Sequence, residues 1–174
     1  MKYEIAKYNP IYYDREGCYN HDEWTNICDV GKSYESKVFT IYEYLDIELR
    51  YINTIIDIMK FVGSKFLTIQ YFELDKKHAE KLILNSRFSY YDLPLLHYVQ
   101  TFNKNKHITM KMIAPIIKLC MRDYLYVILV DRKHRLKIDF GYELYLRLEC
   151  CIDKKVLDHI VKYNGLYLNP RVAY

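Results

Sequence analysis

Hydrophobic and polar residues recur with two different periods along the chain, and these periods predict most of its elements. Between residues 41 and 62, apolar side chains recur at spacings of three and four, which places them on one face of a helix. These positions are Leu45, Leu49, Ile52, Ile56 and Met59. Thr40 and Glu43 fit a capping box at its start, and Gly63 fits the left-handed residue that ends it. The pattern therefore predicts a helix over 41–62.

A period of two residues predicts an antiparallel meander of three strands near 124–150. Residues 124–130 form a continuous apolar run, which is typical of a strand covered on both faces. Residues 136–140 and 144–148 alternate apolar and polar side chains, which is typical of half-buried strands. Short polar turns separate the three segments.

Capping residues and one further apolar run predict the remaining elements. Residues that suit an N-cap precede four segments: Asp75, Asp92, Thr109 and Asp153. The helices expected after them cover residues 76–84, 93–102, 110–122 and 154–163. Pro115 is expected to kink the third of these or to delay its start. The β-branched and aromatic run 66–72 predicts a strand.

The first 38 residues contain most of the turn-forming sequences, such as Asn9-Pro10 and Val30-Gly31. We expect short strands or an ordered loop layer there rather than a long helix. The sequence contains no internal repeat and no linker that would divide it. Residues 1–174 are therefore predicted to form a single α+β domain, with helices packed on one face of a mainly antiparallel sheet.

Composition excludes several classes of protein. A chain of 174 residues with 51% hydrophobic residues is too apolar for disorder and long enough to bury a core. Its apolar runs are far shorter than the roughly 20 residues that cross a bilayer, and its N-terminus lacks an apolar signal segment. We therefore expect a cytoplasmic protein without membrane association. Its five cysteines include no CxxC pair and are expected to be reduced thiols.

The sequence lacks the common catalytic and phosphate-binding motifs. Cys18, His21 and Cys28 are the best candidate metal ligands, but they lack the paired spacing of zinc sites and fit ordinary loop residues better. His134, in a basic turn, is the best single candidate for acid–base chemistry, but an ordinary solvated turn is the favoured interpretation. We therefore predict that the protein is not an enzyme and has no catalytic residues, metal or cofactor.

Charge divides the chain into two unlike parts. Residues 1–60 hold seven Lys or Arg against eleven Asp or Glu, a net charge of −4, whereas residues 61–174 have a net charge of +8. The first part also contains nine of the 20 tyrosines. An acidic, aromatic segment has the wrong sign for phosphate and the right sign for a basic protein partner. The basic excess is spread along the rest of the chain, so a protein partner is expected and nucleic acid is not.

Four stretches resemble immunity proteins of bacterial contact-dependent growth inhibition and related polymorphic toxin systems. These stretches are residues 13–17 (YDREG), 22–32 (DEWTNICDVGK), 40–45 (TIYEYL) and 139–145 (DFGYELY). The resemblance implies a small, non-catalytic, cytosolic protein that binds and blocks the C-terminal domain of one cognate toxin.

The expected partner-binding surface runs from Asp14 to Glu48. Its acidic residues would steer a basic partner, and Trp24 would be an anchor if it is not a core residue. The candidate residues are Asp14, Asp22, Glu23, Trp24, Asp29, Glu43, Asp46 and Glu48. Glu43, Asp46 and Glu48 are expected on an exposed helix face. An RNA-binding protein or small nuclease that uses the basic residues of 104–137 is the alternative, and a structural accessory protein is a third.

Overall fold

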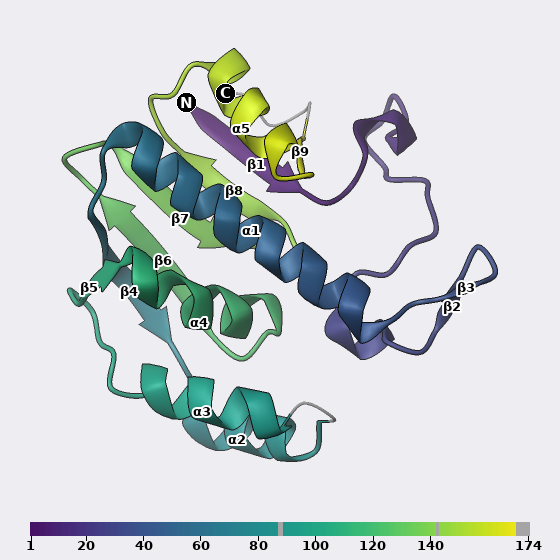
Figure 1. Ribbon diagram of the computed structural model, residues 1–174, viewed down its shortest axis with the longest axis horizontal. Helices are drawn as coiled ribbons and strands as arrows, with labels where there is room; N and C mark the ends of the chain where they lie inside the picture. The colour runs from purple at the N-terminus through teal and green to yellow at the C-terminus, as the bar shows by residue number, and fades with distance from the viewer. Residues whose placement is uncertain (87–88, 142, 170–174) are drawn as a thin grey trace.

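A seven-stranded, mainly antiparallel sheet forms the centre of the protein. The computed structural model describes residues 1–86, 89–141 and 143–169 (Figure 1). The strand order is β5-β4-β6-β7-β8-β1-β9. The strands are β1 (Lys2–Ala6), β4 (Phe66–Glu73), β5 (His107–Thr109), β6 (Tyr126–Asp131), β7 (Leu136–Phe140), β8 (Leu146–Glu149) and β9 (Tyr167–Leu168). The pairs β6–β7 and β7–β8 are antiparallel neighbours, so the predicted meander is confirmed.

Three helices, α1 (Ile41–Val62), α4 (Met110–Met121) and α5 (Lys154–Tyr163), lie across one face of this sheet (Figure 1). The pair α2 (Lys76–Leu84) and α3 (Ser89–Val99) packs together and contacts α4 through α3. This arrangement confirms the predicted α+β class. The other sheet face, called the open face below, carries polar side chains of β7 and β8, such as Lys137, Arg147 and Glu149, together with Ile128 and Val130 of β6, because residues alternate between the two faces along each strand.

Helix α1 begins and ends where the sequence predicts. Thr40 and Glu43 form the capping box, and Gly63 ends the helix with a φ of 74°. Its predicted apolar face is only partly right, because Leu45 and Leu49 are 39% and 53% exposed. The buried residues are Tyr44, Glu48, Tyr51, Ile52, Thr54, Ile55, Ile58 and Met59. The buried face includes polar side chains that find hydrogen-bond partners inside the protein, and hydrophobicity alone does not identify such positions.

Two other helices differ from their predictions. Helix α3 begins at Ser89, so Asp92 lies inside the helix and is fully buried instead of capping its N-terminus. Pro115 lies within α4 without dividing it, and Thr109 makes no side-chain capping bond. Strand β8 begins at Leu146, because the preceding Glu143 and Leu144 adopt positive φ values of 55° and 63° in the turn.

The N-terminal segment contributes to the main sheet before it leaves it. Strand β1 pairs with β8 and β9, a long-range pairing that the sequence pattern did not reveal. Residues 7–40, called the N-terminal excursion below, then project to one side of the sheet (Figure 1). The excursion contains two 3-10 turns, Pro10–Tyr12 and Ile27–Asp29, and a small hairpin of β2 (Ser33–Tyr34) and β3 (Lys37–Val38). The predicted layer of short strands and ordered loops is therefore confirmed.

Candidate functional site

Trp24 joins the N-terminal excursion to the rest of the protein. Ile27, Phe39 and Tyr44 form a small buried cluster, and Trp24 packs against both this cluster and the main core. Its ring stacks on Phe39, with centroids 4.2 Å apart and an angle of 15° between the planes. The Lys7 ammonium lies 4.2 Å from the centroid of the same indole. Trp24 therefore packs mainly inside the protein, where it connects the excursion to the main core.

Asp14 folds its own loop. One of its carboxylate oxygens accepts hydrogen bonds from three consecutive backbone amides, those of Glu16, Gly17 and Cys18, at 2.7–2.9 Å. The other oxygen accepts a bond of 2.9 Å from the Asn20 amide group. Bonds of this kind close a turn around an aspartate. Asp14 therefore stabilises the loop of residues 14–20, and all four of these bonds come from residues close to it in the sequence.

Asp29 has a similar role in the second half of the excursion. It forms a capping box with Asn26 and accepts further bonds from the Thr25 amide at 2.9 Å and the Lys32 ammonium at 2.7 Å. Burial alone would raise the pKa of Asp29, but the bonds from Lys32 and the two amides outweigh burial and lower it. Asp29 is 9% exposed, so little of its side chain is accessible to a partner.

Glu23 is the counter-ion of a buried lysine. Its carboxylate accepts hydrogen bonds from the Lys7 ammonium and from the Tyr19 hydroxyl. The Lys7 side chain is only 2% exposed, and burial lowers its pKa although Glu23 opposes this effect. Because a buried charge needs a partner, Glu23 stabilises the base of the excursion.

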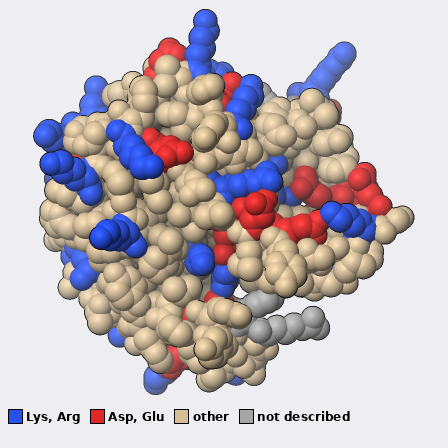
Figure 2. Space-filling view, viewed as in Figure 1, with Lys and Arg blue, Asp and Glu red and all other residues tan. Residues whose placement is uncertain are grey.

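A small pocket collects several of the predicted residues. It has a volume of about 160 Å³ and lies between the excursion and the first turn of α1. Its carboxylates are Asp22, Glu23, Glu35 and Glu43, its aromatic rings are Trp24, Tyr34 and Phe39, and His21 and Lys37 complete it. Figure 2 shows Asp and Glu side chains gathered at the right of the molecule, where Figure 1 places the excursion. We call this concavity the acidic pocket.

Sequence reasoning missed Glu35, which lies at the tip of the β2–β3 hairpin. Glu35 and Ser36 have φ values of 47° and 67°, as the two central residues of a tight two-residue turn require. Asn-Gly is the usual sequence signal for such a turn, whereas the sequence Glu35-Ser36 does not predict one. The turn holds an exposed carboxylate at the rim of the acidic pocket.

Glu43 and Asp46 lie near the start of α1 but only Glu43 lines the pocket. Glu43 caps the helix and accepts a bond from the Lys37 ammonium, and these bonds lower its pKa to about 2. It is therefore ionised throughout the physiological range. Asp46 is exposed and forms an ion pair of 2.7 Å with Arg50, one turn further along the helix.

Glu48 does not lie on an exposed helix face, and that prediction is wrong. Its side chain is fully buried, and both of its oxygens accept bonds from Arg122, at 2.6 and 2.8 Å. The same guanidinium also donates to the buried Asp92. Burial raises the pKa of both carboxyls, against the effect of Arg122. A partner cannot reach Glu48 in this folded state.

The other candidate chemistry has ordinary structural roles. The Nδ1 of His134 lies 2.6 Å from the Asp131 carboxylate, within the β6–β7 turn. Cys18 and Cys28 are exposed, and all five cysteines are free thiols. Among the described residues, no group of three His, Cys, Asp or Glu side chains could hold a metal ion. Within the same residues, no helix has both the length and the apolar character needed to cross a membrane.

Comparisons with protein-family models, with curated proteins and with solved structures find no match to this chain.

Proposed function

We propose that the chain is a non-catalytic, cytoplasmic immunity protein that binds the C-terminal domain of a cognate toxin and occludes its active or substrate-binding face. The observation that carries this proposal is the acidic pocket, whose lining combines four carboxylates and three aromatic rings with one lysine and one histidine. Its volume is well below the roughly 300–1,000 Å³ of small-molecule sites, which favours a single protruding side chain of a protein partner. A lysine or arginine side chain has the matching charge and shape.

An exposed apolar strip on α1 extends this surface. Tyr42, Leu45 and Leu49 recur at helical spacing and are 81%, 39% and 53% exposed. Tyr42 directly precedes Glu43 of the acidic pocket, so apolar and acidic groups are neighbours along the first turns of the helix. Protein interfaces commonly combine an apolar centre with charged groups at the rim. The strip and the acidic pocket together form the proposed binding surface.

Two exposed carboxylates of the acidic pocket, Asp22 and Glu35, provide the first test because they lie outside the buried ion pairs. We would measure binding to the toxin domain encoded by the neighbouring gene. The charge-neutral variant Asp22→Asn/Glu35→Gln is expected to bind about tenfold more weakly, mainly through slower association. The matched control Glu73→Gln/Asp158→Asn removes the same charge elsewhere and should change affinity less than about twofold. Equal losses would contradict the proposed surface.

Tyr42 provides a second, sharper test because the chain contains a matched residue. Tyr163 lies on α5 and is also 81% exposed. We expect Tyr42→Ala to weaken the toxin complex by about tenfold or more, as at other aromatic anchors, and Tyr163→Ala to leave it unchanged. A growth assay with the toxin domain should show the same order of protection. If the unaltered chain neither binds the toxin domain nor protects against it, the proposed function is wrong.

A further inference from the structure

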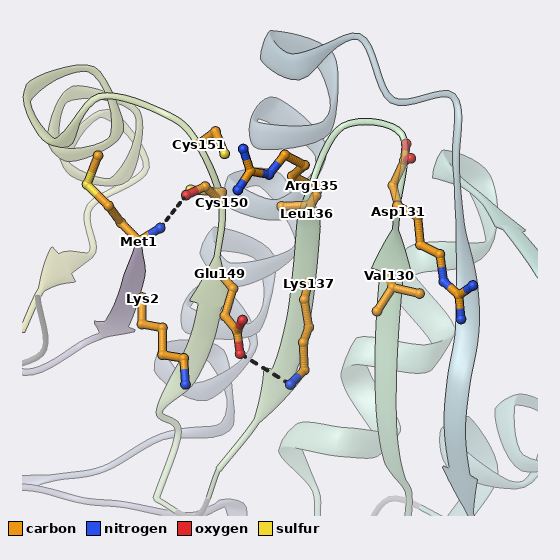
Figure 3. Close-up of a pocket in the computed structure, with 11 residues that line it drawn as sticks. Met1, Lys2, Val130, Asp131, Arg135, Leu136, Lys137, Glu149, Cys150 and Cys151 are labelled. Atoms are coloured by element: carbon orange, nitrogen blue, oxygen red, sulfur yellow. Dashed lines mark hydrogen bonds and ion pairs between the residues drawn. The ribbon is translucent and has the colours of Figure 1, made fainter. Parts of the chain in front are cut away.

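Two hollows on the open face of the sheet share one edge and are lined by basic side chains. The first has a volume of about 550 Å³ and lies over the β6–β7 turn and the ends of β8 and β1 (Figure 3). The second, of about 380 Å³, lies between this turn, the start of β4 and the loop before β5. Val130, Asp131 and Arg132 line both hollows, so the two hollows are adjacent. We call the two hollows together the basic groove.

The charge of the basic groove is strongly unbalanced. Its cationic side chains are Lys2, Lys104, Arg132, Lys133, Arg135 and Lys137, whereas its carboxylates are Asp131 and Glu149. Figure 3 shows Lys137, Glu149 and Lys2 on neighbouring strands, with a bond of 3.2 Å between the first two. The other five cations are exposed and form no ion pair with any of the described residues. Their charge is available to a ligand.

The loops that carry these cations are held firmly. Asp131 accepts bonds from the Ser64 hydroxyl at 2.6 Å and from the ring of His134, which fixes the β6–β7 turn. The Asp131 carboxylate is thus bonded to Ser64 and His134 and forms no ion pair with Arg132 or Arg135. In the second loop, the Asn105 amide donates to Ile69 of β4 at 2.8 Å, which anchors the neighbouring Lys104. These bonds fix the backbone from which the cations project, so the loops need no rearrangement to present them to a ligand.

An aromatic ring lies at one end of the groove. Phe66 begins β4, is 42% exposed and lines the second hollow on the same sheet face as Thr68. Its other neighbour is His107, at 4.4 Å between ring centroids. Proteins that bind single-stranded nucleic acids commonly combine a basic groove with an exposed aromatic ring. The cations contact the phosphates, and a base stacks on the ring.

We propose that the basic groove binds the phosphate backbone of a single-stranded nucleic acid, with one base stacked on Phe66. The groove is separate in sequence from the acidic pocket, so this inference does not rest on the proposed immunity function. The spread of cations over two joined hollows favours an extended polyanion over a single phosphate group. The competing explanation is that these cations form an ordinary solvated surface that binds no ligand.

Fluorescence anisotropy of a labelled oligouridylate of about 12 nucleotides, which is within the site size of single-domain binders, tests the proposal. If the five unpaired cations each contact a phosphate, the logarithm of the binding constant should fall with the logarithm of salt concentration with a slope of about −3 to −4. The variant Arg132→Gln/Arg135→Gln should weaken binding by about tenfold or more near 0.1 M salt, with a slope shallower by about 1.4.

The control Lys154→Gln/Lys155→Gln removes the same charge from α5, where both lysines are exposed, and should change the affinity less than about twofold. Phe66→Leu should weaken oligouridylate binding by about fivefold while leaving the affinity for inorganic tripolyphosphate unchanged, because only a base can stack. An equal loss of oligouridylate affinity in the two double variants would show that the basic groove is not the binding site. Binding to phosphatidylserine vesicles or duplex RNA in preference to oligouridylate would overturn the single-stranded ligand.

Discussion

The acidic pocket and the basic groove hold their charges in opposite ways. Around the pocket, Glu23 and Glu43 are bonded to lysines, and further along α1 the buried Glu48 is bonded to Arg122. In the groove, Arg132 and Arg135 have no ionic partner among the described residues. Two of the four carboxylates that line the acidic pocket are therefore held in ion pairs with lysines, whereas five of the six cations of the basic groove form no ion pair with the described residues.

This difference changes what the charge of each region means. A count of charged residues gives the N-terminal part a strongly acidic character, yet only a few of its carboxylates, such as Asp22 and Glu35, remain exposed and outside the buried pairs. A paired and buried charge costs stability when its partner is removed, whereas an exposed and unpaired one can be removed freely and is available for binding. Substitutions at the two sites should therefore separate stability from binding.

The largest effect is expected at the buried cluster of Glu48, Asp92 and Arg122. Arg122→Met would leave Glu48 and Asp92 without their cation, and we expect the free energy of unfolding to fall by about 3–5 kcal/mol near neutral pH. Without the guanidinium, the folded-state pKa of both carboxyls rises further above the unfolded value of about 4. The folded variant then binds more protons than the unfolded chain, so its stability falls as pH rises through and above 4.

Urea unfolding at about pH 4.5 and pH 7 measures this dependence. The loss relative to the unaltered protein should be clearly larger at the higher pH. The control is Lys162→Met, which breaks an exposed ion pair of 2.7 Å with Asp158 and should cost less than about 1 kcal/mol at either pH. An equal loss for both variants would mean that the Arg122 cluster does not hold the helices together.

A smaller effect is expected at the base of the excursion. Glu23→Gln keeps the size of the side chain but leaves the ammonium of Lys7, which is 2% exposed at its side chain, without a counter-charge. We expect a loss of about 2–3 kcal/mol in the free energy of unfolding, because the carboxylate is itself partly exposed. The matched change Asp158→Asn should cost less than about 1 kcal/mol. If Glu23→Gln is as mild as the control, Glu23 is a surface residue and belongs among the binding residues.

The elements that follow local rules could be predicted from the sequence. The bounds of α1 follow from its capping box and Gly63, and the meander follows from alternation in consecutive segments. The place of β1 could not be predicted, because its partners β8 and β9 lie more than 140 residues further along the chain. The early start of α3 also escaped prediction, since Asp92 suits an N-cap and only the position of Arg122 explains its burial.

The candidate site was predicted in part for the same reason. The sequence identifies an acidic, aromatic segment, and Asp22, Glu23, Trp24 and Glu43 do meet in one pocket. Local sequence does not reveal which carboxylates have distant partners, so Glu48 was wrongly expected at the surface. The basic residues of 104–137 were named only as part of the RNA-binding alternative, and they include every cation of the basic groove except Lys2. The sequence does not reveal that these cations gather, because β1, the loop before β5 and the β6–β7 turn are adjacent only in the folded protein.

A modest effect is expected at the turn that supports the basic groove. Asp131→Asn weakens the bonds to Ser64 and His134 and should lower the free energy of unfolding by about 1–2 kcal/mol near pH 6. Burial would raise the pKa of Asp131, but the bonds from Ser64 and His134 lower it below the unfolded value. Its contribution is therefore present above about pH 4 and is lost as pH falls further. The difference between the two proteins should shrink in that range when unfolding is measured from pH 6 downwards, and a constant difference would contradict the assignment.

The smallest effect on stability is expected at the arginines of the basic groove, where substitution is expected to weaken oligouridylate binding most. Arg132→Gln/Arg135→Gln should change the free energy of unfolding by no more than about 0.5 kcal/mol, because both guanidinium groups are exposed and unpaired among the described residues. Thermal unfolding beside the Lys154→Gln/Lys155→Gln control measures this, and the two variants should unfold within a few degrees of each other. A marked loss confined to the first variant would show that the groove's arginines stabilise the fold as the carboxylates of the excursion do. The contrast between the two regions would then fail, and the weaker binding of that variant would no longer identify a ligand site.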